Sequence, residues 1–107
     1  MEEIYGKWIQ LEDQPYPGLW FEFDKNQRFE ARYDAMGIVS SGHYEIDTNK
    51  IDIYQTEHTL GFTGHFKGLF NIEDDRLFLA LPAGPGQPRP ADLSEARIYK
   101  KHNSDQR

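Results

Sequence analysis

Residues 42–53 read GHYEIDTNKIDI, and residues 68–79 read GLFNIEDDRLFL. Glycine, an aromatic residue, isoleucine, an acid, Asn or Asp, a base and two aliphatic residues occur in the same order in both stretches. Alternation of apolar and polar residues is typical of strands. Asp and Asn at the centre favour a tight turn because they tolerate left-handed backbone and bond their own main chain. The repeat therefore predicts two β-hairpins of the same design.

The same alternation extends along most of the chain, and residues 24–27, DKNQ, provide a third tight turn beside those at 47–49 and 73–75. A pattern typical of amphipathic helices is almost absent. We expect eight strands, at about residues 3–9, 19–24, 28–34, 38–47, 50–57, 62–73, 76–81 and 95–101.

Eight short antiparallel strands leave two unpaired edges unless the sheet closes on itself. The predicted fold class is therefore all-β, an eight-stranded antiparallel up-and-down barrel of the lipocalin or streptavidin type. Loops alternate between the two ends of such a barrel, so the three tight turns share one end. The longer connections, at 10–18, 35–37, 58–61 and 82–94, share the other end, where we expect function to reside.

The 107 residues have room for a single domain, which we place at residues 1–101, with a disordered tail at 102–107. The net charge of -6 disfavours nucleic acid and anionic membranes as partners. The start, MEEIYGKWIQ, lacks the features of a signal peptide, and no stretch is apolar enough for a membrane span, so a cytoplasmic location is expected.

The phase of each strand sorts its side chains into two faces. The expected inward set is Leu19, Phe21, Phe23, Phe29, Ala31, Tyr33, Tyr44, Ile46, Ile51, Ile53, Phe62, Phe66, Phe70, Ile72, Leu77, Leu79, Leu81 and Ile98. The expected outward apolar set on strands five to eight is Tyr54, Leu69, Phe78, Ala80 and Tyr99. Adjacent exposed apolar side chains suggest a homodimer or homotetramer formed through that face.

An eight-stranded barrel is either filled by its own side chains or holds one small ligand, and the sequence leaves both open. If it is hollow, Tyr33, Tyr44 and Gln55 are its polar groups, with Phe21 and Phe66 among the apolar walls. The candidates for the mouth are Tyr16, Trp20, Met36, His58, Arg89 and Asp92.

Arg89 and His58 are the chemically distinctive residues of this mouth. Arg89 stands between two prolines on a stiff backbone and could pair with a ligand carboxylate. The alternative is that it pairs with Asp92 or Glu95 and only pins the loop. His58 contributes a titratable imidazole.

Recognisable catalytic motifs are absent. The four histidines, at 43, 58, 65 and 102, lack metal-motif spacing, there is no cysteine, and no G-x-S-x-G or phosphate-binding glycine loop occurs. No catalytic residue, metal site or cofactor is therefore predicted, and enzymatic activity stays open. The leading expectation is a barrel that binds an apolar or aromatic small molecule at the long-loop end. The alternatives are a cyclase- or isomerase-type enzyme and a structural or interaction barrel with a filled core.

Gly6-Lys7-Trp8 on the first strand, with Arg97 on the last, resembles the G-x-W and arginine arrangement of the calycin group of barrels. That resemblance implies structural roles for Gly6, Trp8 and Arg97, with the tryptophan plugging one end of the barrel and the arginine packing across it.

A closer resemblance lies in GHYEIDTNKIDIY (42–54), LGFTGHF (60–66) and IYKK (98–101). These stretches are similar to a small uncharacterised bacterial barrel family typified by an Agrobacterium protein and grouped with streptavidin-like folds. The matching positions are Gly6, Trp8, Gly42, Tyr44, Ile46, Asn49, Ile51, Gly61, Phe62 and Tyr99. The longer first loop and residues 82–94 depart from the family pattern, and the resemblance implies a fold but no activity.

Overall fold

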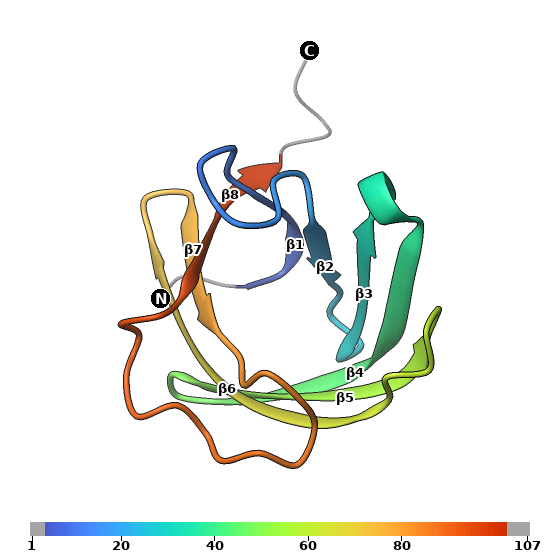
Figure 1. The fold of residues 1–107 in the computed structure, drawn as a ribbon. Coiled ribbons are helices and arrows are strands. Elements are labelled where there is room, and N and C mark those ends of the chain that lie inside the picture. Colours follow the sequence, from blue (N-terminus) through green and yellow to red (C-terminus); the bar gives the residue numbers. More distant parts are fainter. Residues whose placement is uncertain (1–3, 103–107) are drawn as a thin grey trace.

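The protein is a closed barrel of eight antiparallel strands, each hydrogen-bonded to its neighbours in chain order, as the computed structural model of residues 4–102 shows (Figure 1). The strands are β1 (Gly6–Gln10), β2 (Trp20–Phe23), β3 (Arg28–Tyr33), β4 (Ile38–Asp47), β5 (Lys50–His58), β6 (Gly64–Glu73), β7 (Arg76–Ala80) and β8 (Arg97–His102). One turn of 3-10 helix, η1 (Asp34–Met36), joins β3 to β4. The predicted all-β up-and-down barrel is confirmed.

Closure is made by β1 and β8, which pair antiparallel from Lys7 opposite His102 to Gln10 opposite Tyr99. His102 is thus the last residue of a strand, and the expected tail boundary at residue 102 is wrong. The rest of the expected tail, 103–107, lies outside the described residues.

The tight turns use the chemistry that their sequences predict. Asp74 and Asp75 both have positive φ, 47° and 51°, between the paired residues Glu73 and Arg76. Two consecutive residues with positive φ give a turn whose twist matches that of the flanking strands. In the first tight turn, Asp24 Oδ1 accepts hydrogen bonds from the backbone N–H groups of Asn26 and Arg28, both at 2.9 Å.

The glycine that opens each copy of the repeat lies where two strands cross closely. A Cβ on Gly42 would lie 1.9 Å from the carbonyl oxygen of Tyr54, and one on Gly68 would lie 2.6 Å from that of Ala80. The register of β4 against β5 also shifts between Ser41 and Gly42. The repeat therefore has an architectural cause, because both hairpins need a residue without a side chain at the same point.

Aromatic rings fill the middle of the barrel. Phe21 stacks on Phe23 at 5.7 Å between centroids and meets the edge of Tyr99 at 5.8 Å, while Tyr44 packs against Phe23 at 5.0 Å. The other members of the central cluster are Ile4, Trp8, Phe29, Ala31, Ile51, Ile53, Phe70, Leu77 and Leu79. The central interior is filled.

Trp8 is 2% exposed, and its indole N–H donates to the carbonyl of Ile4 at 2.8 Å. The expected packing of Arg97 across Trp8 is wrong. Lys101 is the residue opposite Trp8 in the β1–β8 ladder, and its ammonium lies 4.6 Å from the indole centroid. Gly6, with φ 113°, leaves room for that lysine, because a Cβ there would lie 2.7 Å from Lys101 Nζ.

Two expected inward residues are misplaced, and a third is incompletely buried. Ile46 shares the inward phase of Tyr44 but is 40% exposed near the end of β4. Phe62 is 59% exposed in the loop before β6, where no strand phase applies. On β8 the phase is opposite to the expected one: Tyr99 belongs to the central cluster, so Ile98 lies on the other face. A strand's two faces alternate strictly, so an error of one residue exchanges them.

The expected outward apolar face is also corrected. Tyr99 is in the core, and Leu69 and Ala80 are buried although they lie outside the central cluster. Only Tyr54 and Phe78 of the five remain partly exposed. Self-association through strands five to eight stays a prediction.

Candidate functional site

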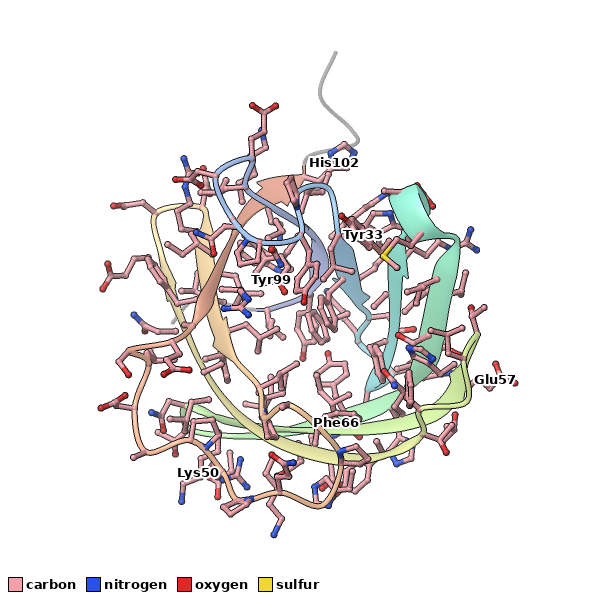
Figure 2. All side chains as sticks on the ribbon, viewed as in Figure 1. Tyr33, Lys50, Glu57, Phe66, Tyr99 and His102 are labelled. Carbon is pink, nitrogen blue, oxygen red and sulfur yellow. The ribbon has the colours of Figure 1, made fainter. Side chains whose placement is uncertain are left out.

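A cavity of about 630 Å³ opens at the long-loop end of the barrel. Its walls come from the β1–β2 loop, the end of β7, the start of β8 and the β7–β8 loop. Figure 2 shows the side chains of the barrel with Tyr99, one of the lining residues, labelled. The apolar walls include Leu19, Phe21, Leu79 and Leu81, and the polar side chains are Gln10, Tyr16, Asp92, Ser94, Glu95, Arg97 and Tyr99.

The β1–β2 loop is fastened to the barrel on both sides of this cavity. Gln10 N donates to the carbonyl of Leu19 at 2.7 Å, and Leu11 N donates to that of Ile98 at 3.1 Å. The amide oxygen of Gln14 accepts from Ile98 N at 3.0 Å. These bonds continue the β1–β2 and β1–β8 ladders into the loop, so this wall of the cavity is held in place.

Gln10, the last residue of β1, has a buried side chain that is 2% exposed. Its Oε1 accepts the backbone N–H of Tyr16 at 2.7 Å, which fixes the orientation of the amide because that backbone group can only donate. Its Nε2 is the only buried side-chain nitrogen or oxygen in residues 4–102 without a hydrogen-bond partner. The amide therefore has donor capacity left over in a residue that lines the cavity.

Tyr99 lies directly opposite Gln10 in the β1–β8 ladder. Burial raises the pKa of Tyr99 to about 12, and the nearby Gln10 amide and the charge of Arg97 act in the opposite direction. The lowering by Gln10 is that of an amide N–H directed at the phenol oxygen, although the geometry of Nε2 falls outside that of an ordinary hydrogen bond. Tyr99 is thus a protonated phenol at neutral pH, able to donate a hydrogen bond.

We expect Gln10→Met to leave the free energy of unfolding unchanged within about 1 kcal/mol, or to raise it. The substitution loses the bond to Tyr16 N, which contributes about 1 kcal/mol, but it also removes a buried donor whose desolvation costs about 1–3 kcal/mol. Urea denaturation followed by circular dichroism measures the change. A loss above about 2 kcal/mol would mean that Nε2 is satisfied in solution.

Arg89 lies away from the cavity and holds the β7–β8 loop against the outside of the barrel. Its guanidinium donates to the carbonyl of Gly68 at 2.8 Å and to Asp52 Oδ1 at 3.0 Å. Its expected role in binding a ligand at the mouth is therefore corrected, as is the alternative pairing with Asp92 or Glu95. Figure 1 shows this loop, in orange, on the outer side of β5 and β6.

The carboxylate of Asp52 also contacts His65, whose Nε2 lies 3.0 Å from the oxygen that binds Arg89. Burial alone would raise the pKa of Asp52, but the hydrogen bonds with His65 and Arg89 outweigh it, so the pKa is below its usual value. The charged carboxylate thereby supports the loop that carries Pro90, Ala91 and Asp92 to the rim of the cavity.

The remaining expected ligand residues divide between the two ends of the barrel. Tyr44 points to the tight-turn end, where its hydroxyl donates to the carbonyl of Asp24 at 2.7 Å and burial raises its pKa to about 12. Gln55 donates to the carbonyl of Phe62, and His58 Nδ1 accepts from Leu60 N at 2.9 Å. Both of these bonds order the β5–β6 loop, and neither residue lines the cavity.

Tyr33 meets Tyr16 edge to face at 5.9 Å, and Phe66 packs against the core; both are labelled in Figure 2. Of the seven expected ligand-binding residues, only Phe21 lines the cavity. Tyr16 and Asp92, from the expected mouth set, line it as well. Arg97, expected to be structural, is also in its wall, with its guanidinium 6.0 Å from the Tyr16 ring centroid.

Gln10 and Tyr99 are the functional candidates that the sequence interpretation missed. Gln10 is two residues beyond Trp8 and shares its inward phase, a usable signal, but the predicted first strand ends at residue 9 and excludes it. The predicted phase of the last strand turns Ile98 inward and therefore Tyr99 outward.

The described chain offers few other functional features. In residues 4–102, His, Cys, Asp and Glu side chains form no group of three or more that could hold a metal ion. No helix in this range is both long and apolar enough to cross a bilayer.

Fold and cavity together define a small up-and-down β-barrel with a cavity at one end. Comparison with protein-family models, curated proteins and solved structures found no match. The expected kinship with the Agrobacterium-type family stays a prediction.

Proposed function

We propose that this protein binds a small molecule with an apolar or aromatic body in the cavity at the long-loop end. A volume of about 630 Å³ is within the usual range for sites that hold one organic ligand. Leu19, Phe21 and Leu79 offer apolar contact on the walls, and a few polar groups on one side would orient the ligand.

The observation that carries the proposal is the unpartnered Nε2 of Gln10. Leaving a buried donor without an acceptor costs about 1–3 kcal/mol, and a ligand acceptor would remove that cost. A second hollow of about 540 Å³ lies at the tight-turn end, beside Tyr5, Tyr44 and Ile46. It contains no comparable orphaned side-chain atom among the described residues, which favours the first cavity.

The two alternative functions have less support. The aromatic core agrees with a structural barrel, but a cavity of this size at the mouth is not needed for such a role. For a cyclase or isomerase, the buried titratable candidate in the cavity wall is Tyr99, whose raised pKa of about 12 suits a hydrogen-bond donor better than a general base at neutral pH. The two acids of the wall, Asp92 and Glu95, are exposed.

Binding can be tested with N-phenylnaphthylamine, a neutral probe whose fluorescence rises in apolar surroundings. We expect saturable binding to the wild-type protein and a loss of affinity of about tenfold or more in Ala91→Trp. Ala91 is an exposed cavity-lining residue of the β7–β8 loop, so an indole there would occupy cavity volume without disturbing the core.

Ala35→Trp is the matched control, because Ala35 is also exposed, lies in η1 at the same end of the barrel and does not line the cavity. Its affinity for the probe should equal that of the wild type. Equal affinity in all three proteins would mean that the probe binds elsewhere, and no saturable binding to the folded wild type would reject the proposed function.

A further inference from the structure

The buried polar groups of the cavity are hydrogen-bond donors. Gln10 has only its Nε2 left to offer, since its oxygen is occupied by Tyr16 N. Tyr99 keeps its phenolic proton at neutral pH. Arg97 brings a guanidinium, which has donors and no acceptor. A ligand that reaches these three residues meets donors on one side of the cavity.

The strand register places these donors next to one another. Gln10 and Tyr99 are partners across the β1–β8 ladder. Arg97 is two residues before Tyr99 on β8, so the two side chains are on the same face of that strand. The influence of both Gln10 and Arg97 on the Tyr99 phenol agrees with this proximity.

Arg97 forms no ion pair with a carboxylate in residues 4–102. The three ion pairs within residues 4–102 involve Arg32, His65 and Arg89 as their basic partners, so Arg97 takes part in none of them. Its described contact is with the Tyr16 ring at 6.0 Å, and the side chain is half-buried. A partly desolvated guanidinium without a carboxylate is a ready site for an anion.

The cavity also has two acids, Asp92 and Glu95, but both are exposed and lie in the β7–β8 loop. Asp92 Oδ1 already accepts Ser94 N at 3.0 Å. Charge therefore changes with depth, from carboxylates at the exposed rim to donors in the buried wall. A ligand with one negative group can bind with that group at the buried donors and its apolar body toward the rim. A ligand with negative charge at both ends would be repelled by the carboxylates at the rim.

We propose that the ligand of this cavity is a monoanionic carboxylate with an apolar or aromatic body, its carboxylate held by Arg97, Gln10 Nε2 and Tyr99. This inference rests on the proposed function, since it names the class of molecule that the same cavity takes. The apolar body lies against Leu19, Phe21 and Leu79. The overall charge of -6 would repel an anion at the general surface, so the preference has to come from the local guanidinium.

The test compares three probes with one aromatic body: naphthoate, neutral naphthamide and cationic naphthylmethylammonium. Each is titrated at pH 7 as a competitor of N-phenylnaphthylamine. We expect naphthoate to bind about tenfold more tightly than naphthamide in the wild type, because hydrogen bonds to an ionised acceptor are roughly twice as strong as neutral ones. The ammonium should bind most weakly.

Arg97→Gln should reduce the preference for naphthoate over naphthamide to about twofold or less, because the affinity for naphthoate falls much more than that for naphthamide. Arg97→Lys should keep part of the preference, since it retains the charge but lacks the bidentate geometry. Arg76→Gln is the matched control, because it removes the same charge from an exposed residue at the start of β7 that does not line the cavity. It should behave as the wild type.

The outcomes separate this inference from the proposed function. If naphthamide competes as well as naphthoate, the cavity binds small molecules but the carboxylate assignment is overturned. Tightest binding by the ammonium would also overturn it, in favour of recognition by Asp92 and Glu95. A preference for naphthoate that survives intact in Arg97→Gln would place the anion elsewhere. If N-phenylnaphthylamine does not bind, the proposed function and this inference both fail.

Discussion

Gly42→Ala is expected to lower the free energy of unfolding by about 3 kcal/mol or more, although it adds a single methyl group. A Cβ at this position would lie 1.9 Å from the carbonyl oxygen of Tyr54 and 3.0 Å from the backbone nitrogen of Thr56. Both are backbone atoms of β5, so the clash cannot be relieved by rotating a side chain. The β4–β5 ladder must therefore separate locally. The expected loss in the free energy of unfolding is at the upper end of what overpacking usually costs.

The measurement is urea denaturation followed by circular dichroism, with Gly84→Ala as the control. Gly84 lies in the β7–β8 loop, its φ is not positive, and the nearest atom to an added Cβ is Gln87 Nε2 at 3.6 Å. The control should change stability by no more than about 0.5 kcal/mol. Equal stabilities for the two variants would show that β4 and β5 are not held as closely as the structure has them.

Trp8→Ala is expected to destabilise the barrel by about 4 kcal/mol, the cost of removing a large buried aromatic side chain. The substitution empties space between the central cluster and Lys101 and removes the donor that binds the carbonyl of Ile4. It should leave the cavity-lining residues in place, because Trp8 does not line the cavity.

Trp20→Ala makes the same chemical change at a half-buried position, where the indole packs against Lys7 with the ammonium 4.0 Å from the ring centroid. We expect a cost of about 1 kcal/mol there. Circular dichroism is again the suitable probe, because both variants lose a tryptophan. A cost for Trp8→Ala no greater than that for Trp20→Ala would contradict the role of Trp8 in closing the core.

The architecture could be predicted because its signals are local. Alternation along each strand, Asp-rich centres such as Asp74-Asp75, and the repeated glycines are all visible in short windows, and the β4 bounds were predicted without error. Counting eight strands and requiring that no edge stay open then led to the closed barrel. The exceptions are strand ends, such as Phe62, where a strand phase was extended into a loop.

The candidate site was predicted less well, because it depends on contacts between distant parts of the chain. The long-loop end was identified correctly, and Phe21, Tyr16 and Asp92 line the cavity found there. The sequence predicts Arg89 at the mouth because its positive charge could bind a ligand carboxylate and because it lies in one of the long loops. Its partners, Asp52 and the carbonyl of Gly68, lie on other strands, and no local pattern indicates them.

The sequence by itself determined that this chain forms eight paired strands and where the tight turns fall. The tertiary structure alone decided which polar groups meet. In the folded barrel Gln10 lies opposite Tyr99, the guanidinium of Arg97 contacts the Tyr16 ring, and the ammonium of Lys101 contacts the Trp8 ring. The physical reason is that a strand's phase sets two faces, but only the register of β1 against β8 selects which face is inside, and a shift of one residue exchanges every side chain.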